Sequence, residues 1–273
     1  MKRLTLLFIT MITLLSNTAN SQDQKAVEIL ESMQERYEQS IENIDDYIIE
    51  KDDHTIYHKK ATTKDGRPYF KTKTKGEYRE DMESASAANK DLYSQFSSQA
   101  KEKATYKGTD EVDGNKVHVV YIDQMEIEGF NPDRDTENTI ENIFLYIDSD
   151  ELVIRKMEYT MKSQIKGKEV REISPVIKNS NFRNVEGMLI PYETTTVIKG
   201  LNLTDEERKE AEQGLRDFEE KMEEMPKSQR EMVEQMAGGQ IEKFRKMIEE
   251  DQYERVSQVK NIEVNTGMEM EDF

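Results

Sequence analysis

Apolar residues recur with two different periods along this chain, and the change of period divides it into regions. From Gln24 to Ser40 they recur every three or four positions, as on one face of an amphipathic helix. Between Tyr47 and Lys199 most apolar runs are short and extended, which is typical of strands. Beyond Gly200 the three-four spacing returns. The pattern therefore predicts a helix, a long β region and a second helical region.

The β region predicts an antiparallel sheet. Extended runs are predicted at 47–51, 54–62, 69–75, 106–112, 116–123, 142–161 (as a hairpin), 170–182 and 188–199. The turns between them are predicted at Lys64-Asp65-Gly66, Asp113-Gly114, Asp148-Ser149-Asp150 and Asn184-Val185-Glu186-Gly187. A second helix is predicted over 89–104 and a polar loop over 126–142. Because the links leave no room for crossover helices, we predict a meander of about eight strands. Residues 256–264 are predicted to return to it as a last strand.

The helical region after Gly200 predicts an amphipathic arm. Thr204 followed by Glu207 has the spacing of a capping box, so we interpret Thr204 as a helix cap. Pro226 predicts a fresh helical start and Gly238-Gly239 a break. The predicted apolar face consists of Leu215, Phe218, Met222, Met225, Met232 and Met236. Such methionines occur at promiscuous binding surfaces, but packing of the arm on itself or on the sheet is the favoured interpretation.

The N-terminus has the pattern of a secretory signal peptide. Met1-Lys2-Arg3 is basic, Leu4 to Leu15 is apolar but short for a bilayer span, and cleavage is predicted after Ser21. The chain has no cysteine, which excludes disulfides, thiol chemistry and a lipid-modified cysteine anchor. Export without these features predicts a soluble periplasmic protein. The net charge of −18 predicts repulsion of nucleic acid and of anionic lipid head groups.

Candidate chemistry is sparse. His54 and His58 share a face of a predicted strand but lie ~13 Å apart, too far for one metal ion, so a surface or edge role is favoured. His118 stands alone. The stretch 133–137 begins like a calcium loop, but Asn138 and Phe144 stand where glycine and a bidentate acid belong. No phosphate loop or nucleophile elbow occurs, so the sequence predicts no catalytic residue, metal or cofactor.

Four stretches resemble one family: AVEILESMQERY, YKGTDEVDGNKVHVVYID, LYIDSDELVIRKMEYTM and SNFRNVEGMLIPYETTTVIKG. They are similar to the LolA-like superfamily of periplasmic outer-membrane lipoprotein-sorting proteins. The most specific piece runs from Phe182 to Pro191, where a strand turns at Gly187 and re-enters through proline. The resemblance implies an α+β fold, a curved antiparallel half-barrel whose concave face is covered by helices. It also implies an apolar pocket for acyl chains of lipoproteins or other lipids.

The resemblance also implies a layout and a pocket. Residues 1–21 would be the signal peptide, 22–203 with 253–265 the half-barrel, 204–252 a Met-rich acidic helical arm before the last strand, and 266–273 a tail. Leu152 and Ile154 would lie on the convex side, and Arg155 would be a charge at the rim. The pocket would be lined by Val153, Met157, Tyr159, Met161, Ile190, Tyr192 and Ile198, with Thr194 and Thr196 in the same inward set.

Two functions follow from this, and a third has less support. The first is a periplasmic carrier of a lipid or of lipoprotein acyl chains. The second is a non-enzymatic interaction or sensor module that docks a membrane-protein partner through its arm. The third is a hydrolase that uses carboxylates the sequence does not single out. The arm itself is open to three roles: lid, docking element or packing.

Overall fold

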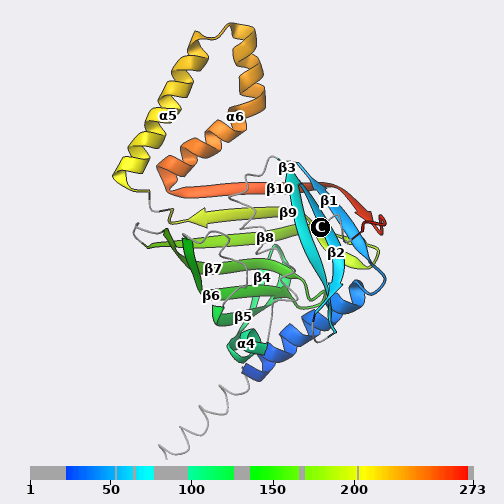
Figure 1. Ribbon diagram of the computed structural model, residues 1–273. Helices are drawn as coiled ribbons and strands as arrows, with labels where there is room; N and C mark the ends of the chain where they lie inside the picture. The colour runs from blue at the N-terminus through cyan, green and yellow to red at the C-terminus, as the bar shows by residue number, and fades with distance from the viewer. Residues whose placement is uncertain are drawn as a thin grey trace, which may run out of the picture.

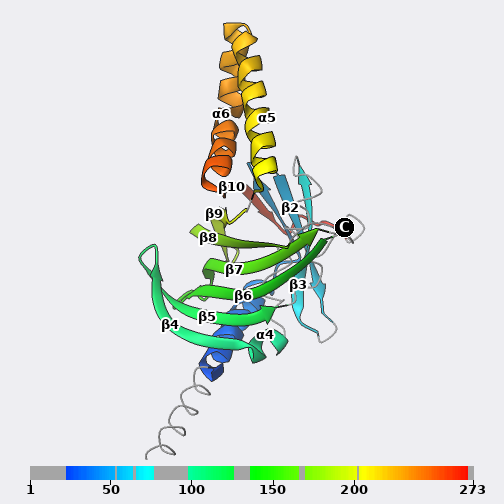
Figure 2. The same cartoon turned by 90° about the vertical axis from the view of Figure 1, so that its left-hand side faces the viewer.

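The computed structural model of this chain describes residues 23–52, 54–63, 66–76, 98–125, 136–165, 170–201 and 203–269. Within these ranges ten strands, rather than about eight, form one antiparallel sheet in the order β3-β2-β1-β10-β9-β8-β7-β6-β5-β4 (Figure 1). Their bounds are β1 (Asp46–Lys51), β2 (His54–Thr62), β3 (Pro68–Gly76), β4 (Ala104–Val112), β5 (Asn115–Met125), β6 (Thr136–Asp148), β7 (Ile154–Ile165), β8 (Arg171–Val185), β9 (Met188–Lys199) and β10 (Gln252–Val264). The sheet is open, with β3 and β4 at its two sides, and it curves strongly (Figure 2). The predicted α+β half-barrel is confirmed.

Two of the tight turns follow directly from local sequence. Asp113 and Gly114 between β4 and β5 have φ of 50° and 76°, and Glu186 and Gly187 between β8 and β9 have φ of 50° and 95°. Positive φ at both central residues is the type I′ geometry that matches the twist of paired strands, and glycine adopts it without strain. Both predicted turns are confirmed.

The last strand connects the first strand to the rest of the sheet. β10 lies between β1 and β9, where Tyr47 pairs with Val264 and Lys199 pairs with Gln252. The buried Asp46 carboxylate accepts the backbone N–H of Thr266 at 2.6 Å, which fixes the segment after β10 beside β1. The predicted return of residues 256–264 to the sheet is confirmed.

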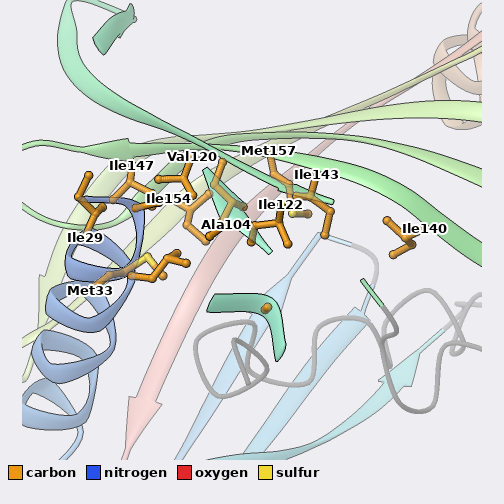
Figure 3. Packing of buried hydrophobic residues seen from close by; sticks show 14 of the residues in the cluster. Ile29, Met33, Ala104, Val120, Ile122, Ile140, Ile143, Ile147, Ile154 and Met157 are labelled. Atoms are coloured by element: carbon orange, nitrogen blue, oxygen red, sulfur yellow. The ribbon is translucent and has the colours of Figure 1, made fainter. Parts of the chain in front are cut away.

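The N-terminal helix, described over residues 23–40, packs on the concave side of β5–β7. Its face with three-four spacing is buried, with Ala26, Leu30 and Met33 at 0 % exposure. Figure 3 shows Ile29 and Met33 pointing from the helix toward the inward side chains of the sheet. Each large apolar side chain buried there stabilises the fold by ~1.5–3 kcal/mol. The helix therefore anchors one half of the sheet through this first hydrophobic cluster.

A second hydrophobic cluster holds the other half of the molecule. Ile41 and Ile44, just after the N-terminal helix, pack with Phe70 of β3 and with Met188 and Ile190 of β9. Strands β1–β3 run across the direction of β5–β8, so they form a leaf that faces the rest of the sheet (Figures 1 and 2). The molecule thus has two clusters, one on each side of the bend.

The predicted loop over 126–142 is wrong in its second part. Residues 126–135, which include the start of the calcium-like stretch, lie outside the described residues, but β6 begins at Thr136. Ile140 pairs with Met161 of β7 and is 4 % exposed. One inward isoleucine among acidic residues, Asn and Thr gives too little alternation to indicate a strand from sequence.

The predicted helix over 89–104 is described only at its end. α4 (Ser98–Glu102) stops before β4, and Ala104, placed in the helix by the sequence pattern, is instead the first residue of that strand. Leu92 and Phe96 lie outside the described residues.

Two antiparallel helices, α5 (Asp205–Glu224) and α6 (Lys227–Glu250), form an arm that projects from the sheet between β9 and β10 (Figure 1). The capping box is confirmed: the Glu207 N–H donates to Thr204 Oγ1 at 3.2 Å, and the Thr204 N–H donates to the Glu207 carboxylate at 3.0 Å. The fresh start after Pro226 is confirmed too. The break at Gly238-Gly239 is wrong, since α6 runs through both glycines. Each costs only ~1 kcal/mol relative to alanine, which a 24-residue helix outweighs.

The arm folds back on itself, but its apolar face is only partly covered. No residue of α5 is buried, and Leu215, Met222 and Met225 are half-buried. Phe218 is 36 % and Met232 56 % exposed, and the side chain of Met236 is not described. A helix with one neighbouring helix cannot cover an apolar stripe from both sides, so packing of the arm on itself leaves part of the stripe exposed. None of the described helices is both long and apolar enough to cross a membrane.

Candidate functional site

A cavity of about 430 Å³ lies between the two hydrophobic clusters. Its walls come from the end of the N-terminal helix, from the β1–β3 leaf and from β7–β10. It shares Met33 and Met157 with the first cluster, and Ile56 and Ile190 with the second. Cavities of about 300–1,000 Å³ with mostly apolar walls are typical small-molecule sites.

Most of the predicted pocket residues lie on this wall, but two do not. Val153, Met157, Tyr159, Ile190 and Ile198 line the cavity. Burial raises the pKa of Tyr159 to about 12, so its hydroxyl stays neutral.

The two exceptions lie elsewhere. Met161 is buried in the first cluster away from the cavity wall. Tyr192 is not on the wall either. Its ring lies under the Arg183 guanidinium, with 4.0 Å between the guanidinium carbon and the ring centre.

A β-bulge at the start of β7 changes which residues face the cavity. Tyr146 of β6 pairs with Lys156, but the next residue, Ile147, pairs with Ile154. Arg155 is therefore an extra residue on β7, and an extra residue shifts the inward and outward alternation by one.

The bulge overturns three predictions about this hairpin. Leu152 and Ile154, predicted on the convex side, both line the cavity. Arg155, predicted as an inward rim charge, is not on the wall. Its Nε donates to Asp148 Oδ2 at 2.5 Å, and its guanidinium carbon lies 5.2 Å from the Phe182 ring centre.

Asp148 holds this turn in shape. Its Oδ1 accepts the backbone N–H groups of Asp150 at 2.9 Å and Glu151 at 2.8 Å. Burial would raise the pKa of Asp148, but the hydrogen bonds from Glu151 and Arg155 outweigh it and hold the pKa below its usual value. The carboxylate therefore stays ionised and fixes the segment that presents Leu152 to the cavity.

His58 lies on the cavity wall, so the predicted surface or edge role is wrong for it. Its ring stacks on Tyr47, with 4.1 Å between centroids and 8° between planes, and its Nδ1 lies 3.3 Å from Thr72 Oγ1. Burial, with a smaller contribution from the Lys51 charge, lowers the pKa of His58 to about 3. Its Nε2 is buried without a hydrogen-bond partner among the described residues. The ring is thus a neutral polar group facing an apolar space.

Polar residues line the part of the cavity wall that β1, β2, β9 and β10 form. Lys51 pairs with Val259 of β10, and Glu50 pairs with Thr55, so Lys51 and His54 flank the β1–β2 turn. Both line the cavity. Strand alternation places Lys51 on the same inward face as Ile49 and Tyr47. The sequence analysis did not predict Lys51 on the cavity wall, because a charged residue is rarely expected at an inward position.

The lining continues as a polar belt along β10. Ser257 and Arg255 follow Val259 at successive inward positions, opposite Thr194 and Thr196 of β9, and all four line the cavity. The Ser257 hydroxyl, in a residue 8 % exposed, has no hydrogen-bond partner among the described residues.

The described parts of the chain contain no cluster of side chains suited to a metal ion. No three His, Asp or Glu side chains there come together as metal ligands would. His118 lies outside the cavity, where its Nδ1 is 3.3 Å from the Tyr106 hydroxyl. The site therefore offers a cavity with mostly apolar side chains and a group of polar ones on its wall.

No protein-family model and no curated protein matches this chain. Among solved structures it is similar to a domain described as an outer membrane lipoprotein-sorting protein from Vibrio parahaemolyticus, with 9 % identity, a TM-score of 0.43, and coverage of 92 % of this chain and 96 % of that one. A DUF1329 family protein from Desulfovibrio piger is similar at 8 % identity and a TM-score of 0.40, covering 91 % of this chain and 95 % of that one.

Proposed function

We propose that this chain is a periplasmic carrier that holds a lipid, or the acyl chains of a lipoprotein, in the cavity between its two hydrophobic clusters. The cavity itself is the observation that carries the proposal: about 430 Å³ lined by side chains such as Met33, Met157, Ile177 and Ile190. The signal-peptide pattern of residues 1–21 and the absence of cysteine support export to the periplasm without a lipid anchor.

Acyl binding needs no catalytic group. Each methylene moved from water to an apolar wall contributes ~0.8 kcal/mol, so ten of them contribute ~8 kcal/mol. That figure, before the entropy cost of binding, corresponds to a dissociation constant of about 1 μM. Among the described residues no three possible metal ligands come together, and we propose a non-enzymatic role with no cofactor.

Native mass spectrometry of the full chain purified from the periplasm tests the carrier function. We expect a lipid-sized adduct on the wild type. Met157→Asp should lose it, because a carboxylate on the apolar wall would have to be desolvated beside the alkyl chain. Met232→Asp, on the exposed face of the arm, is the matched control and should retain the adduct.

Two further measurements keep this test decisive. Circular dichroism checks that Met157→Asp is folded. If that variant does not fold, Thr196→Trp, which places a large ring in the cavity from a half-buried position, replaces it. A bare wild-type mass, together with no binding of extracted lipids or acylated peptides, would contradict carriage.

The arm favours a second candidate function, docking on an envelope membrane protein. Phe218, Met232 and Phe244 are 36 %, 56 % and 40 % exposed, and these large apolar side chains all belong to α5 and α6. Exposed apolar patches of this kind mark interaction sites.

Replacing the arm tests docking separately from carriage. Because Lys199 pairs with Gln252, residues 200–251 can be exchanged for a two-residue Asn-Gly turn. In the full chain, a photo-crosslinker at Met232, but not one at exposed Lys71 of β3, should capture a defined membrane protein. The arm-replaced chain should still hold lipid. Loss of lipid from that chain would instead make the arm a lid.

A further inference from the structure

Most residues of the cavity wall are buried or half-buried, but a few are exposed. Among the described residues that line the cavity, the exposed ones are Arg36 of the N-terminal helix, Glu151 of the β6–β7 turn and Gly187 of the β8–β9 turn. A residue that lines a cavity and is also exposed lies where the cavity reaches the protein surface. These three residues therefore mark an opening.

The N-terminal helix forms one side of this opening. Met33 lines the cavity at 0 % exposure, and Arg36, one turn later on the same side of the helix, also lines it with a side chain that is 50 % exposed. Met33 belongs to the first hydrophobic cluster, whereas Tyr37 packs against the second. The helix thus emerges from the interior at the point where it passes from one cluster to the other.

The β6–β7 turn forms the opposite side. The Glu151 side chain is 48 % exposed, and its carboxylate lies 2.6 Å from Arg36 Nη2. The next residue, Leu152, is half-buried and lines the cavity. The Glu151 backbone N–H donates to Asp148 Oδ1 at 2.8 Å, so the backbone of the turn is fixed while the Glu151 side chain reaches toward the helix.

The β8–β9 turn continues the same boundary. A Cβ atom at Gly187 would lie 3.8 Å from the Ser40 carbonyl oxygen, so this turn lies against the end of the helix. Ser40 lines the cavity too, ~6 Å along the helix from Arg36. The exposed wall residues therefore follow one seam between helix residues 36–40 and two turns of the sheet.

Side chains alone bridge the seam between Arg36 and Glu151. An ion pair between half-exposed side chains contributes little to stability, so it breaks and re-forms readily. Burial of Met33 holds the helix in place, and Asp148 holds the turn. The two charged side chains can therefore swing into solvent without unfolding either element.

We propose that this seam is the portal through which the alkyl chain of a lipid enters and leaves the cavity, with the Arg36–Glu151 ion pair as its gate. The proposal rests on the proposed carrier function and locates the path of the cargo. The alkyl chain passes Leu152 and Met33 to reach Met157, while the polar part of the molecule stays in water beside the charged side chains. This arrangement avoids burial of a polar head group in the apolar cavity.

A reversible cross-link across the seam tests the portal. The chain has no cysteine, so two introduced cysteines define a single cross-link. In the full chain, Arg36→Cys with Glu151→Cys is joined by a short bis-methanethiosulfonate reagent, which a reductant removes. The probe is cis-parinarate, a slender fatty acid that fluoresces in apolar surroundings, and excess tetradecanoate starts its release. We expect the cross-link to slow release at least about tenfold and the reductant to restore it.

A second ion pair supplies the matched control. Arg171 and Glu207 also lie 2.6 Å apart, but they join β8 to α5 and are not on the cavity wall. Arg171→Cys with Glu207→Cys, cross-linked in the same way, should release cis-parinarate at the wild-type rate. The equilibrium affinity of both cross-linked proteins should stay within about twofold of wild type, because a closed gate slows entry and exit alike.

A single substitution tests the gate without a cross-link. Arg36→Ala removes the ion pair and should speed release about two- to threefold at unchanged affinity. Arg216→Ala removes a similarly exposed ion pair on α5 and should leave the rate unchanged. If circular dichroism shows that the double cysteine variant is not folded, this comparison replaces it.

The outcomes separate the portal from the carrier function. Unchanged release after cross-linking, equal slowing in the Arg171–Glu207 control, or slowing that comes only from tighter binding overturns the portal and leaves lipid carriage standing. Failure of cis-parinarate and tetradecanoate to bind the wild type overturns carriage itself.

Discussion

At the scale of single residues, His58 makes the stability of this protein depend on pH. Its pKa is lowered from 6.5 to about 3, because the ring is buried between Tyr47 and Phe70 near the Lys51 charge. An unfolded chain binds the proton below pH 6.5 and the folded chain does not. The stabilising contribution is therefore complete above pH 6.5 and falls as the pH drops from 6.5 toward 3.

Replacement of His58 should remove this part of the pH dependence. The expected slope in the free energy of unfolding between pH 6 and 5 is up to ~1.4 kcal/mol per pH unit for one group. Urea unfolding at several pH values measures it in wild type and in His58→Phe, which retains the stacking on Tyr47. The pKa of His118 is also lowered by burial, but His118 is present in both proteins, so its contribution to the slope cancels in the comparison. An unchanged slope in the variant would show that His58 is protonated in the fold.

The sequence predicted the apolar wall better than the polar one. Met157 and Ile190 follow from strand alternation, because an apolar residue at every second position is a local signal. Ile154 was misplaced because the extra residue Arg155 reverses that alternation, and a bulge has no sequence signature here. His58 and Ser257 were missed because sequence reasoning places polar residues outside a core.

At the scale of elements, the parts fixed by neighbouring residues were predictable. Turns at Asp113-Gly114 and Glu186-Gly187, and the cap at Thr204, need only a few adjacent side chains. β6 was shortened in the prediction because only its pairing with β7 shows that residues 136–142 are extended. Gly238-Gly239 was wrongly predicted to break the helix, because the free energy that two glycines cost is small compared with the stability of a long helix.

The site depends strongly on the position of β10 in the sheet, and local sequence could not predict that position. A return to the sheet was predicted, but its insertion between β1 and β9 depends on pairs more than 200 residues apart, such as Tyr47 with Val264. That insertion brings Ser257 and Arg255 onto the same cavity wall as Lys51. The polar part of the cavity wall is thus a product of topology, not of any one segment.

At the scale of the whole molecule, the cavity divides the hydrophobic interior into two clusters on the two sides of the bend. The sheet joins these halves only through the central strands, with β10 between β1 and β9. An alkyl chain in the cavity would contact Met157 on one side and Ile56 on the other. A bound lipid would therefore add apolar contacts across the bend that the empty protein lacks.

Ligand binding should accordingly stabilise the entire fold. A ligand that binds only the folded chain adds RT ln(1 + [L]/Kd), which is ~2.7 kcal/mol at a hundredfold excess over Kd. For a domain of this size we expect Tm to rise by about 5–10 °C. Differential scanning calorimetry of the delipidated chain with and without tetradecanoate measures the shift. Thr196→Trp, which places a large ring in the cavity, should show a smaller shift, whereas the chain with residues 200–251 replaced should show the full one. An equal shift in Thr196→Trp would place the ligand outside the cavity, on the surface of the sheet or the arm.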